Sequence, residues 1–181
     1  ARWGVPPEIV VAIVGIETSY GRLTGSFRVI DALATLAFDY PRRAPFFRGE
    51  LKEFLLLSGE QGFTPLVPKG SFAGAMGVPQ FMPGSFRRYA VDFDGDARID
   101  LWGSAADVVG SVANYLARHD WQPGGQTIVP AAITDEHRDA VLRRLDGGTS
   151  ERRPLDAWAG DGVGPATLAE PVDEPVGLLM L

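Results

Sequence analysis

The sequence has no cysteine among its 181 residues. That absence excludes disulfide bonds, thiolate chemistry and a cysteine-based zinc site. No apolar run reaches the roughly 18 residues that a membrane-spanning helix needs, and no signal peptide or lipidation signal is present. The formal net charge is −6, which does not indicate the clustered basic face of a nucleic-acid-binding protein. We therefore expect neither a transmembrane segment nor a nucleic-acid partner.

The composition that remains is that of a soluble globular protein. Apolar residues make up 45% of the chain and charged residues 22%, a usual balance for a folded domain. The length suits one domain of ordinary size. The chain begins at Ala1 and ends on the apolar residues 176–181, so we expect a fragment or a trimmed product of a longer protein.

Hydrophobic spacing and helix-end signals predict one mainly helical domain with a minor β element near the C-terminus. Residues 59–74 and 92–100 read as loops, and the tail from residue 146 reads as irregular with an optional terminal strand. The expected helices cover residues 8–20, 31–39, 44–58, 79–89, 104–118 and 135–145, and a strand is expected over residues 126–133.

Glu17 is the most unusual residue of the first predicted helix. Residues 8–20 are apolar nearly all round, which predicts a buried helix, and Glu17 lies near its C-terminal end. Apolar neighbours and the negative end of the helix dipole would both raise the pKa of its carboxyl. A carboxylic acid that stays protonated near neutral pH can protonate a glycosidic oxygen. The alternative is a glutamate on an exposed stripe, or one paired with an arginine.

A second feature suggests a sugar site. Residues 71–83 combine small residues, which allow a ligand to approach the backbone, with the Gln80 amide and an apolar wall. The alternative is a helix start packed tightly on a neighbour. Glycosidases normally use two carboxylates, yet no second carboxylate lies close to Glu17 in the sequence. A mechanism with one carboxylate would remove the need for a second.

Three segments occur in an order that resembles the membrane-bound lytic murein transglycosylase B family, glycoside hydrolase family 103. They are residues 16–21, residues 74–83 with Gly-Ala-Met-Gly followed by Gln80-Phe81-Met82-Pro83, and residues 113–115; residues 31–36 and 40–43 also match. The resemblance covers roughly residues 3–135 and fades beyond. It implies a lysozyme-like helical core over residues 1–135 and a C-terminal extension over residues 136–181, truncated before the aromatic-rich segment usual in the family.

The resemblance also implies a reaction. Glu17 would be the only acid/base, cleaving the bond between N-acetylmuramic acid and N-acetylglucosamine with no cofactor for the chemistry. The muramyl C6 hydroxyl would attack C1 to give a 1,6-anhydro end. The substrate's own N-acetyl oxygen would stabilise the cationic intermediate. A goose-type lysozyme-like hydrolase and a non-catalytic peptidoglycan-binding module are the alternatives.

Binding roles follow from the same resemblance. Ser71 and Gln80 would hydrogen-bond the sugar or its acetamido group, and Tyr115 would line the site near Glu17. Arg42 and Arg43 would meet the peptide stem or the lactyl carboxylate through charge-assisted bonds; the alternative is a solvated surface pair. The implied partner is the peptidoglycan strand, met by a monomer in the periplasm or cell envelope, and the choice between a lipoprotein and a soluble parent protein stays open.

An aspartate-rich segment predicts a cation site. Asp92, Asp94, Asp96 and Asp100 stand at positions 1, 3, 5 and 9 of an EF-hand-like loop, with the Arg98 carbonyl at position 7. Ala97 replaces the usual glycine at position 6, and a non-glycine residue at positive φ is strained. Gly103 stands where the bidentate glutamate belongs.

The family resemblance supplies a last ligand for this loop. The loop of that family is longer than an EF-hand loop, and its last ligand is an aspartate further along the chain. Asp107 fits that position. Asp107 is also the N3 residue of a capping box with Ser104, and the two roles are compatible. We expect a structural calcium ion held over residues 92–107, because clustered carboxylates repel one another without a cation.

Overall fold

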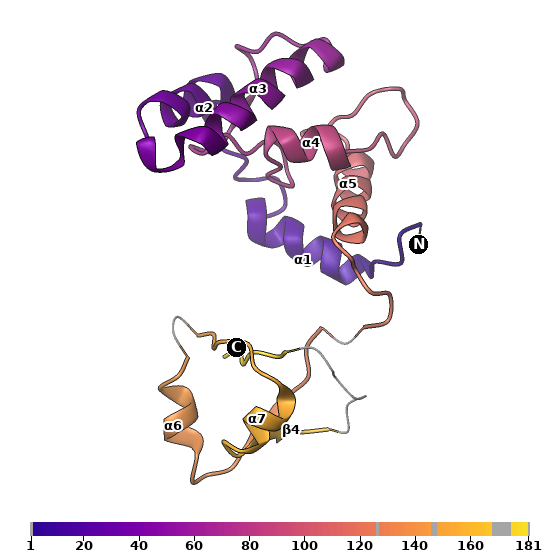
Figure 1. Cartoon of the computed structure of the whole chain (residues 1–181). Helices are drawn as coiled ribbons and strands as arrows, with labels where there is room; N and C mark the ends of the chain where they lie inside the picture. The colour runs from indigo at the N-terminus through magenta and orange to yellow at the C-terminus, as the bar shows by residue number, and fades with distance from the viewer. Residues whose placement is uncertain (1, 126, 146–147, 168–174, 181) are drawn as a thin grey trace. The chain divides into compact units, whose positions relative to one another are not determined.

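The computed structural model describes residues 2–125, 127–145, 148–167 and 175–180 (Figure 1). The chain divides into two compact units, Ala1–Gly124 and Gly125–Leu181. The division expected at residue 135 marks where the family resemblance fades, and it stays a prediction about the extent of the catalytic core. None of the helices within the described residues is long and apolar enough to cross a membrane.

Unit 1 is helical, with one short pair of strands. Strands β1 and β2 pair antiparallel, with Phe27 opposite Gly70 and Arg28 opposite Lys69. The elements in chain order are α1 (Pro7–Thr18), β1 (Phe27–Arg28), α2 (Val29–Phe38), the 3-10 helix η1 (Pro41–Arg43), α3 (Ala44–Gln61), β2 (Lys69–Gly70), α4 (Pro83–Tyr89) and α5 (Ala105–Arg118). The mainly helical prediction is confirmed, and this strand pair was not predicted.

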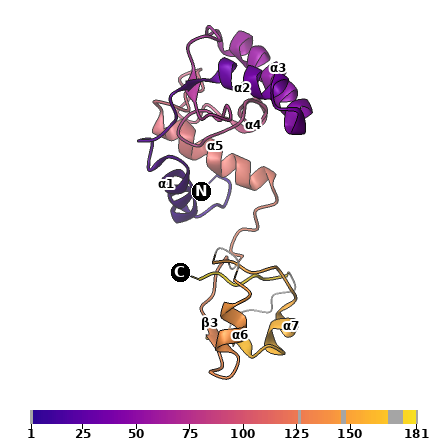
Figure 2. The same cartoon turned by 90° about the vertical axis from the view of Figure 1, so that its left-hand side faces the viewer.

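The main core of unit 1 lies under α2, α3 and α4. Helices α2 and α3 lie side by side in both views, with α4 beside them (Figures 1 and 2). Burial of the apolar side chains in this core removes apolar area from water and supplies most of the stabilising free energy of unit 1. The fully buried apolar residues of this core are Val29, Leu33, Ala37, Phe54, Leu57, Met76, Phe86 and Leu101.

Helix α1 packs on α5 through a smaller cluster. Val10 of α1 meets Val112 and Ala113 of α5, and only Val10 and Thr18 of α1 are buried. Ile16 is 84% exposed. The prediction that this helix is buried all round is therefore wrong. The helix contacts α5 with one face, and its opposite apolar face is open to solvent.

Two helices begin at residues other than the expected ones, and one begins as predicted. The helix expected from residue 31 begins at Val29, so Asp31 lies in the first turn of α2, where its Oδ2 accepts a hydrogen bond from Arg28 Nε at 2.6 Å. Helix α4 begins at Pro83 and not at residue 79, because Gln80 has a φ of 52° and cannot belong to a right-handed helix. Ser104 caps α5 as predicted, with its Oγ accepting from the Asp107 N–H.

Unit 2 holds the β element that was expected near the C-terminus. It contains β3 (Ala131–Ile133), α6 (Arg138–Leu142), α7 (Leu155–Ala159) and β4 (Val163–Pro165), with β3 antiparallel to β4. The expectation of an irregular tail is wrong for α7 and β4, which pack Trp158 and Val163 against Val141. Val176, near the end of the chain, forms an isolated antiparallel β-bridge with Arg153. Residues 126 and 181 of the two expected strands lie outside the described residues.

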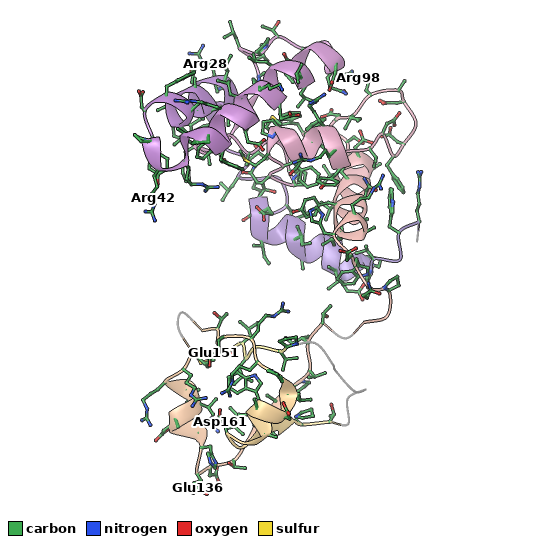
Figure 3. The ribbon with its side chains drawn as sticks, viewed as in Figure 1. Arg28, Arg42, Arg98, Glu136, Glu151 and Asp161 are labelled. Atoms are coloured by element: carbon green, nitrogen blue, oxygen red, sulfur yellow. The ribbon has the colours of Figure 1, made fainter. Side chains whose placement is uncertain are left out.

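Unit 2 is held by an ion-pair network beside Trp158. Asp161 Oδ2 accepts hydrogen bonds from Arg153 Nη2 and, at 2.6 Å, from Arg144 Nη1. The Arg153 guanidinium lies 3.9 Å from the centroid of the Trp158 ring. Figure 3 shows Asp161 between α6 and α7. The hydrogen bond from Arg153 lowers the pKa of Asp161, and the charges of Arg144 and Arg153 act in the same direction.

This network predicts a pH dependence for unit 2. A carboxyl with a lowered pKa in the folded state stabilises the fold above its unfolded pKa of about 4, and that stability is lost as the pH falls through the folded-state value. Asp161→Asn should lower the urea midpoint of unit 2 at pH 7 and flatten its decline in acid. The midpoint can be followed by the NMR signal of the Trp158 indole N–H, which donates to Val176 O at 2.9 Å.

Asp139→Asn is the matched control, because Asp139 is exposed in the same unit. It should leave both the urea midpoint and its pH dependence unchanged. If the urea midpoint of Asp161→Asn declined with falling pH in the same way as that of the wild type, the network would not set the stability of unit 2.

Candidate active site

Glu17 lies in the last turn of α1, as the sequence predicted. The helix ends at Thr18, and Ser19 follows as a left-handed C-cap whose N–H donates to Gly15 O at 2.9 Å. The carboxylate therefore stands near the negative end of the helix dipole. Its side chain is exposed, however, so the expected apolar surroundings are wrong. None of the ion pairs among the described residues includes Glu17.

A tight left-handed turn follows Glu17. Ser19, Tyr20 and Gly21 have φ values of 49°, 61° and 84°, and two of these are non-glycine residues in a strained region. The turn brings the Tyr20 ring back over Gly15, where a Cβ atom would stand 2.9 Å from the phenolic oxygen. The chain reverses direction directly beyond the candidate acid.

The small-residue segment folds as a compact loop over residues 70–81. Met76 and Phe81 exchange backbone hydrogen bonds of 2.8 and 3.0 Å. Ser71 Oγ accepts from the N–H groups of Ala73 and Ala75 at 3.3 and 3.1 Å. The Ser71 hydroxyl thus stabilises the loop itself, and its bond to a sugar stays a prediction.

Gln80 joins this loop to the segment that follows Glu17. Its Nε2 donates to Thr24 O at 3.1 Å and to Gly77 O at 2.9 Å. Both amide hydrogens are used by these bonds. The side-chain oxygen has no hydrogen-bond partner among the described residues, so it can accept one from a ligand.

Thr18 makes a second link between the same two segments, and sequence reasoning missed it. Its Oγ1 donates to Val78 O at 2.9 Å, and the side chain is 1% exposed. A signal was present: Thr18 shares a helix face with Val10 and Val14 at intervals of four residues, so a polar side chain falls on the stripe that faces the core. The structure therefore brings the end of α1 and the 70–81 loop together.

Tyr115 supports the loop from α5. Its ring centroid lies 5.4 Å from that of Phe81, 5.2 Å from that of Tyr89 and 4.0 Å from that of His119, on which it stacks. These aromatic contacts favour a fixed ring orientation. Tyr115 is half-buried and is linked to the site through Phe81. Direct contact with Glu17 or with a sugar stays a prediction.

Arg42 and Arg43 lie in η1, between α2 and α3, and both are exposed. The Arg43 guanidinium stands 4.6 Å from the centroid of the Phe46 ring, a cation–π distance. Figure 3 shows Arg42 at the edge of unit 1. No contact joins either arginine to the end of α1 or to the 70–81 loop in the described part of the chain, so their role in binding a peptide stem stays a prediction.

Three carboxylates of the aspartate loop, residues 92–107, come together. Asp92, Asp94 and Asp107 each place one oxygen within 4.8 Å of the others. Asp107 is 1% exposed, and its two oxygens accept from the N–H groups of Phe93 and Asp100 at 2.8 Å each. Hard oxygen atoms at this spacing are the donor set that Ca²⁺ prefers, and the residues therefore fit a cation.

The group of three carboxylates does not include Asp96. Asp96 Oδ1 accepts from the Arg98 N–H at 2.9 Å, and Figure 3 shows Arg98 on the loop between α4 and α5. Ala97 has a φ of 69°, which confirms the expected strain at the position of the usual glycine. The ligand roles of Asp96 and the Arg98 carbonyl stay predictions.

This mainly helical arrangement is the lysozyme-like fold of the lytic transglycosylases. A family model described as a transglycosylase SLT domain matches residues 1–180, and the chain belongs to that family. The membrane-bound lytic murein transglycosylase B of Escherichia coli strain K12 is 57% identical over 129 residues, which are 71% of this chain and 36% of that protein.

Solved structures agree with that membership. Escherichia coli Slt35 is similar in a complex with bulgecin A (45% identity, TM-score 0.85, 98% of this chain and 54% of that one) and in a complex with calcium (44%, 0.81, 99% and 54%). SltB3 of Pseudomonas aeruginosa in complex with NAG-anhNAM-pentapeptide is 34% identical, with a TM-score of 0.76 over 99% of this chain and 50% of that one. The chain thus spans about half the length of these structural relatives.

The close approach of Gly77 to the core gives a test of the loop. Gly77 has a φ of 69°, and a Cβ atom there would stand 2.6 Å from Leu101 O. Gly77→Ala should lower the free energy of unfolding by about 2–5 kcal/mol, since left-handed strain costs about 1–2 kcal/mol and overpacking about 1–3 kcal/mol. Urea denaturation measures the loss.

Gly62→Ala is the matched control. Gly62 has the same φ of 69°, but a Cβ atom there would meet no atom within 4 Å among the described residues, so only the left-handed strain should appear. Equal losses in the two variants would show that the contact with Leu101 is not what holds the loop.

Proposed function

We propose that the chain forms the catalytic core of a peptidoglycan lytic transglycosylase. It would cleave the β-1,4 bond between N-acetylmuramic acid and N-acetylglucosamine and leave a 1,6-anhydro-muramoyl end. The observation that carries the proposal is the position of Glu17 at the end of α1. The segment that follows Glu17 is joined to the 70–81 loop by the hydrogen bond from Gln80 Nε2 to Thr24 O, and the same Nε2 also donates to Gly77 O within the loop. The family membership and the named activities of the relatives support it.

Glu17 would act twice in this reaction. Its protonated carboxyl donates a proton to the glycosidic oxygen as the bond from C1 to that oxygen breaks. The resulting carboxylate then takes the proton of the muramyl C6 hydroxyl, and the C6 oxygen forms a bond to C1. Glu17 returns to its acid form, and no water is consumed. The substrate's N-acetyl oxygen supplies the stabilisation that a second carboxylate gives in other glycosidases.

The other site residues would bind the glycan strand. Ser71 and Gln80 are proposed to hydrogen-bond the sugar or its acetamido group, and Tyr115 to line the site near Glu17. Arg42 and Arg43 would meet the acidic peptide stem or lactyl group from the 3-10 helix. The complex of SltB3 with NAG-anhNAM-pentapeptide supports a ligand of this class.

The proposed place of action is the periplasm or cell envelope, where peptidoglycan is found. The chain would meet the glycan strand as a monomer. The Escherichia coli relative is named as membrane-bound, and both a membrane-anchored and a soluble parent protein are compatible with this proposal.

Product analysis tests the reaction. Digestion of purified peptidoglycan should release muropeptides with 1,6-anhydro ends, identified by mass spectrometry. Glu17→Gln should lower the rate about 10²- to 10⁴-fold, because the amide cannot donate the proton that the leaving oxygen needs. Reducing-end muramic acid would instead indicate a lysozyme-like hydrolase. An equal rate in Glu17→Gln and wild type, or no cleavage by either, would contradict catalysis by this chain.

We also propose that the aspartate loop binds calcium as a structural ion. Asp92, Asp94 and Asp107 would supply carboxylate oxygens, and Asp96 and the Arg98 carbonyl are proposed as further ligands. Slt35 has been solved in complex with calcium, which supports the choice of ion. The ion would fix the start of α5 and plays no part in bond cleavage.

Calcium should therefore raise the melting temperature of protein stripped of metal. At a concentration of about 100 times Kd, an ion that binds only the folded state adds about 2.7 kcal/mol to the free energy of unfolding. Asp92→Ala should abolish the calcium-dependent rise, and Asp139→Asn in unit 2 should keep it. Scanning calorimetry with and without calcium, with magnesium as the ion control, measures this; no rise in the wild type would contradict calcium binding.

A further inference from the structure

We propose that Thr18 is the positioning residue for Glu17, and that its buried hydroxyl holds the catalytic turn of α1 on the 70–81 loop. This inference rests on the proposed function, because it assigns to Thr18 the placement of the acid. Thr18 would touch neither substrate nor reacting atoms. It would act through the backbone that carries Glu17.

The hydroxyl of Thr18 is used as both donor and acceptor. Its Oγ1 donates to Val78 O at 2.9 Å, with Val14 O at a longer 3.3 Å, and accepts from the Gly21 N–H at 3.0 Å. The side chain is almost completely buried, so loss of the hydroxyl would leave the Val78 carbonyl and the Gly21 amide without this partner.

Val78 is a firm anchor for this contact. Its N–H donates to Leu101 O at 2.8 Å, and Leu101 is fully buried in the main core of unit 1. The Val78 peptide is therefore held from the core on one side and by Thr18 on the other. Gly21 completes the contact, because a Cβ atom there would stand 3.3 Å from the Val78 side chain.

The turn after Glu17 depends on such a restraint. Ser19 and Tyr20 are non-glycine residues in the left-handed region, which persists only where the surroundings enforce it. Thr18 supplies two of the restraints, since its hydroxyl binds the Gly21 N–H and its backbone carbonyl accepts from the Leu23 N–H at 2.9 Å. Without its hydroxyl, the last turn of α1 has less to stop it from unwinding.

The exposed carboxylate makes this backbone restraint decisive. Glu17 has no ion-pair or hydrogen-bond partner among the described side chains, so the position of its carboxyl depends on the helix end that carries it. Thr18 fixes that end relative to the loop, and Gln80 makes the second tie through Thr24 O at 3.1 Å. The proposed acid and the proposed sugar-binding amide are thus held at a set separation.

The test compares the loss of the hydroxyl with the loss of a methyl group. Thr18→Val keeps the shape of the side chain and removes the hydroxyl, and Thr18→Ser keeps the hydroxyl. With soluble glycan strands as substrate, Thr18→Val should lower kcat about 10- to 100-fold with KM within about threefold, as expected for a misplaced acid. Thr18→Ser should stay within about threefold of the wild-type kcat.

Ser111→Ala is the matched control for a lost buried hydroxyl. Ser111 is fully buried in α5, and its Oγ accepts from the Val91 N–H at 2.9 Å. It should lower the melting temperature as Thr18→Val does but keep the wild-type kcat. Amide hydrogen exchange at Gly21 gives a second readout: Thr18→Val should speed it, and Ser111→Ala should not. Thr18→Ala replaces the valine variant in both measurements if that variant does not fold.

The outcomes separate this inference from the proposed function. A Thr18→Val variant with wild-type kcat, or a Thr18→Ser variant as slow as Thr18→Val, would overturn the positioning role while Glu17→Gln remains inactive. If the wild type does not cleave peptidoglycan, the proposed function fails. In that case unchanged Gly21 exchange in Thr18→Val would also overturn the restraint of the turn by Thr18.

Discussion

The hydrogen bond from Thr18 Oγ1 to Val78 O joins two segments that are 60 residues apart in the chain, and the candidate active site is organised around it. On one side of the bond stand the end of α1 and Glu17. On the other side stands the 70–81 loop, which presents Gln80. The Val78 N–H in turn reaches Leu101 of the main core. The end of α1, which carries Glu17, is therefore connected through Val78 to Leu101 of the main core.

The aspartate loop is built on a similar buried contact. Asp107 sits in the first turn of α5, where the helix dipole favours a negative charge, and it ties down the backbone of Phe93 and Asp100. Leu101 follows Asp100 directly and accepts from Val78. The aspartate loop and the 70–81 loop, which are separate in the sequence, are thus joined by the hydrogen bond from the Val78 N–H to Leu101 O.

Helix ends with specific capping chemistry could be predicted from the sequence, and helix surroundings could not. Ser104 with Asp107 three residues later predicted the start of α5, because capping depends only on local backbone groups. The burial of α1 was predicted wrongly, since an apolar residue such as Ile16 does not say whether another element covers it. The start of α4 was missed because the left-handed Gln80 is held by Thr24 O, a contact distant in sequence.

The sequence by itself determined which residues are candidates for the chemistry: Glu17 at a helix end, the small-residue loop with Gln80, and the aspartates of residues 92–107. These candidates follow from residue types and short spacings in the sequence, because such features depend only on local backbone geometry. Only the tertiary structure decided that Glu17 is exposed and that Thr18 links it to Val78. It also decided that Asp92, Asp94 and Asp107 converge while Asp96 does not. Such contacts depend on how distant segments pack, and no local pattern encodes that packing.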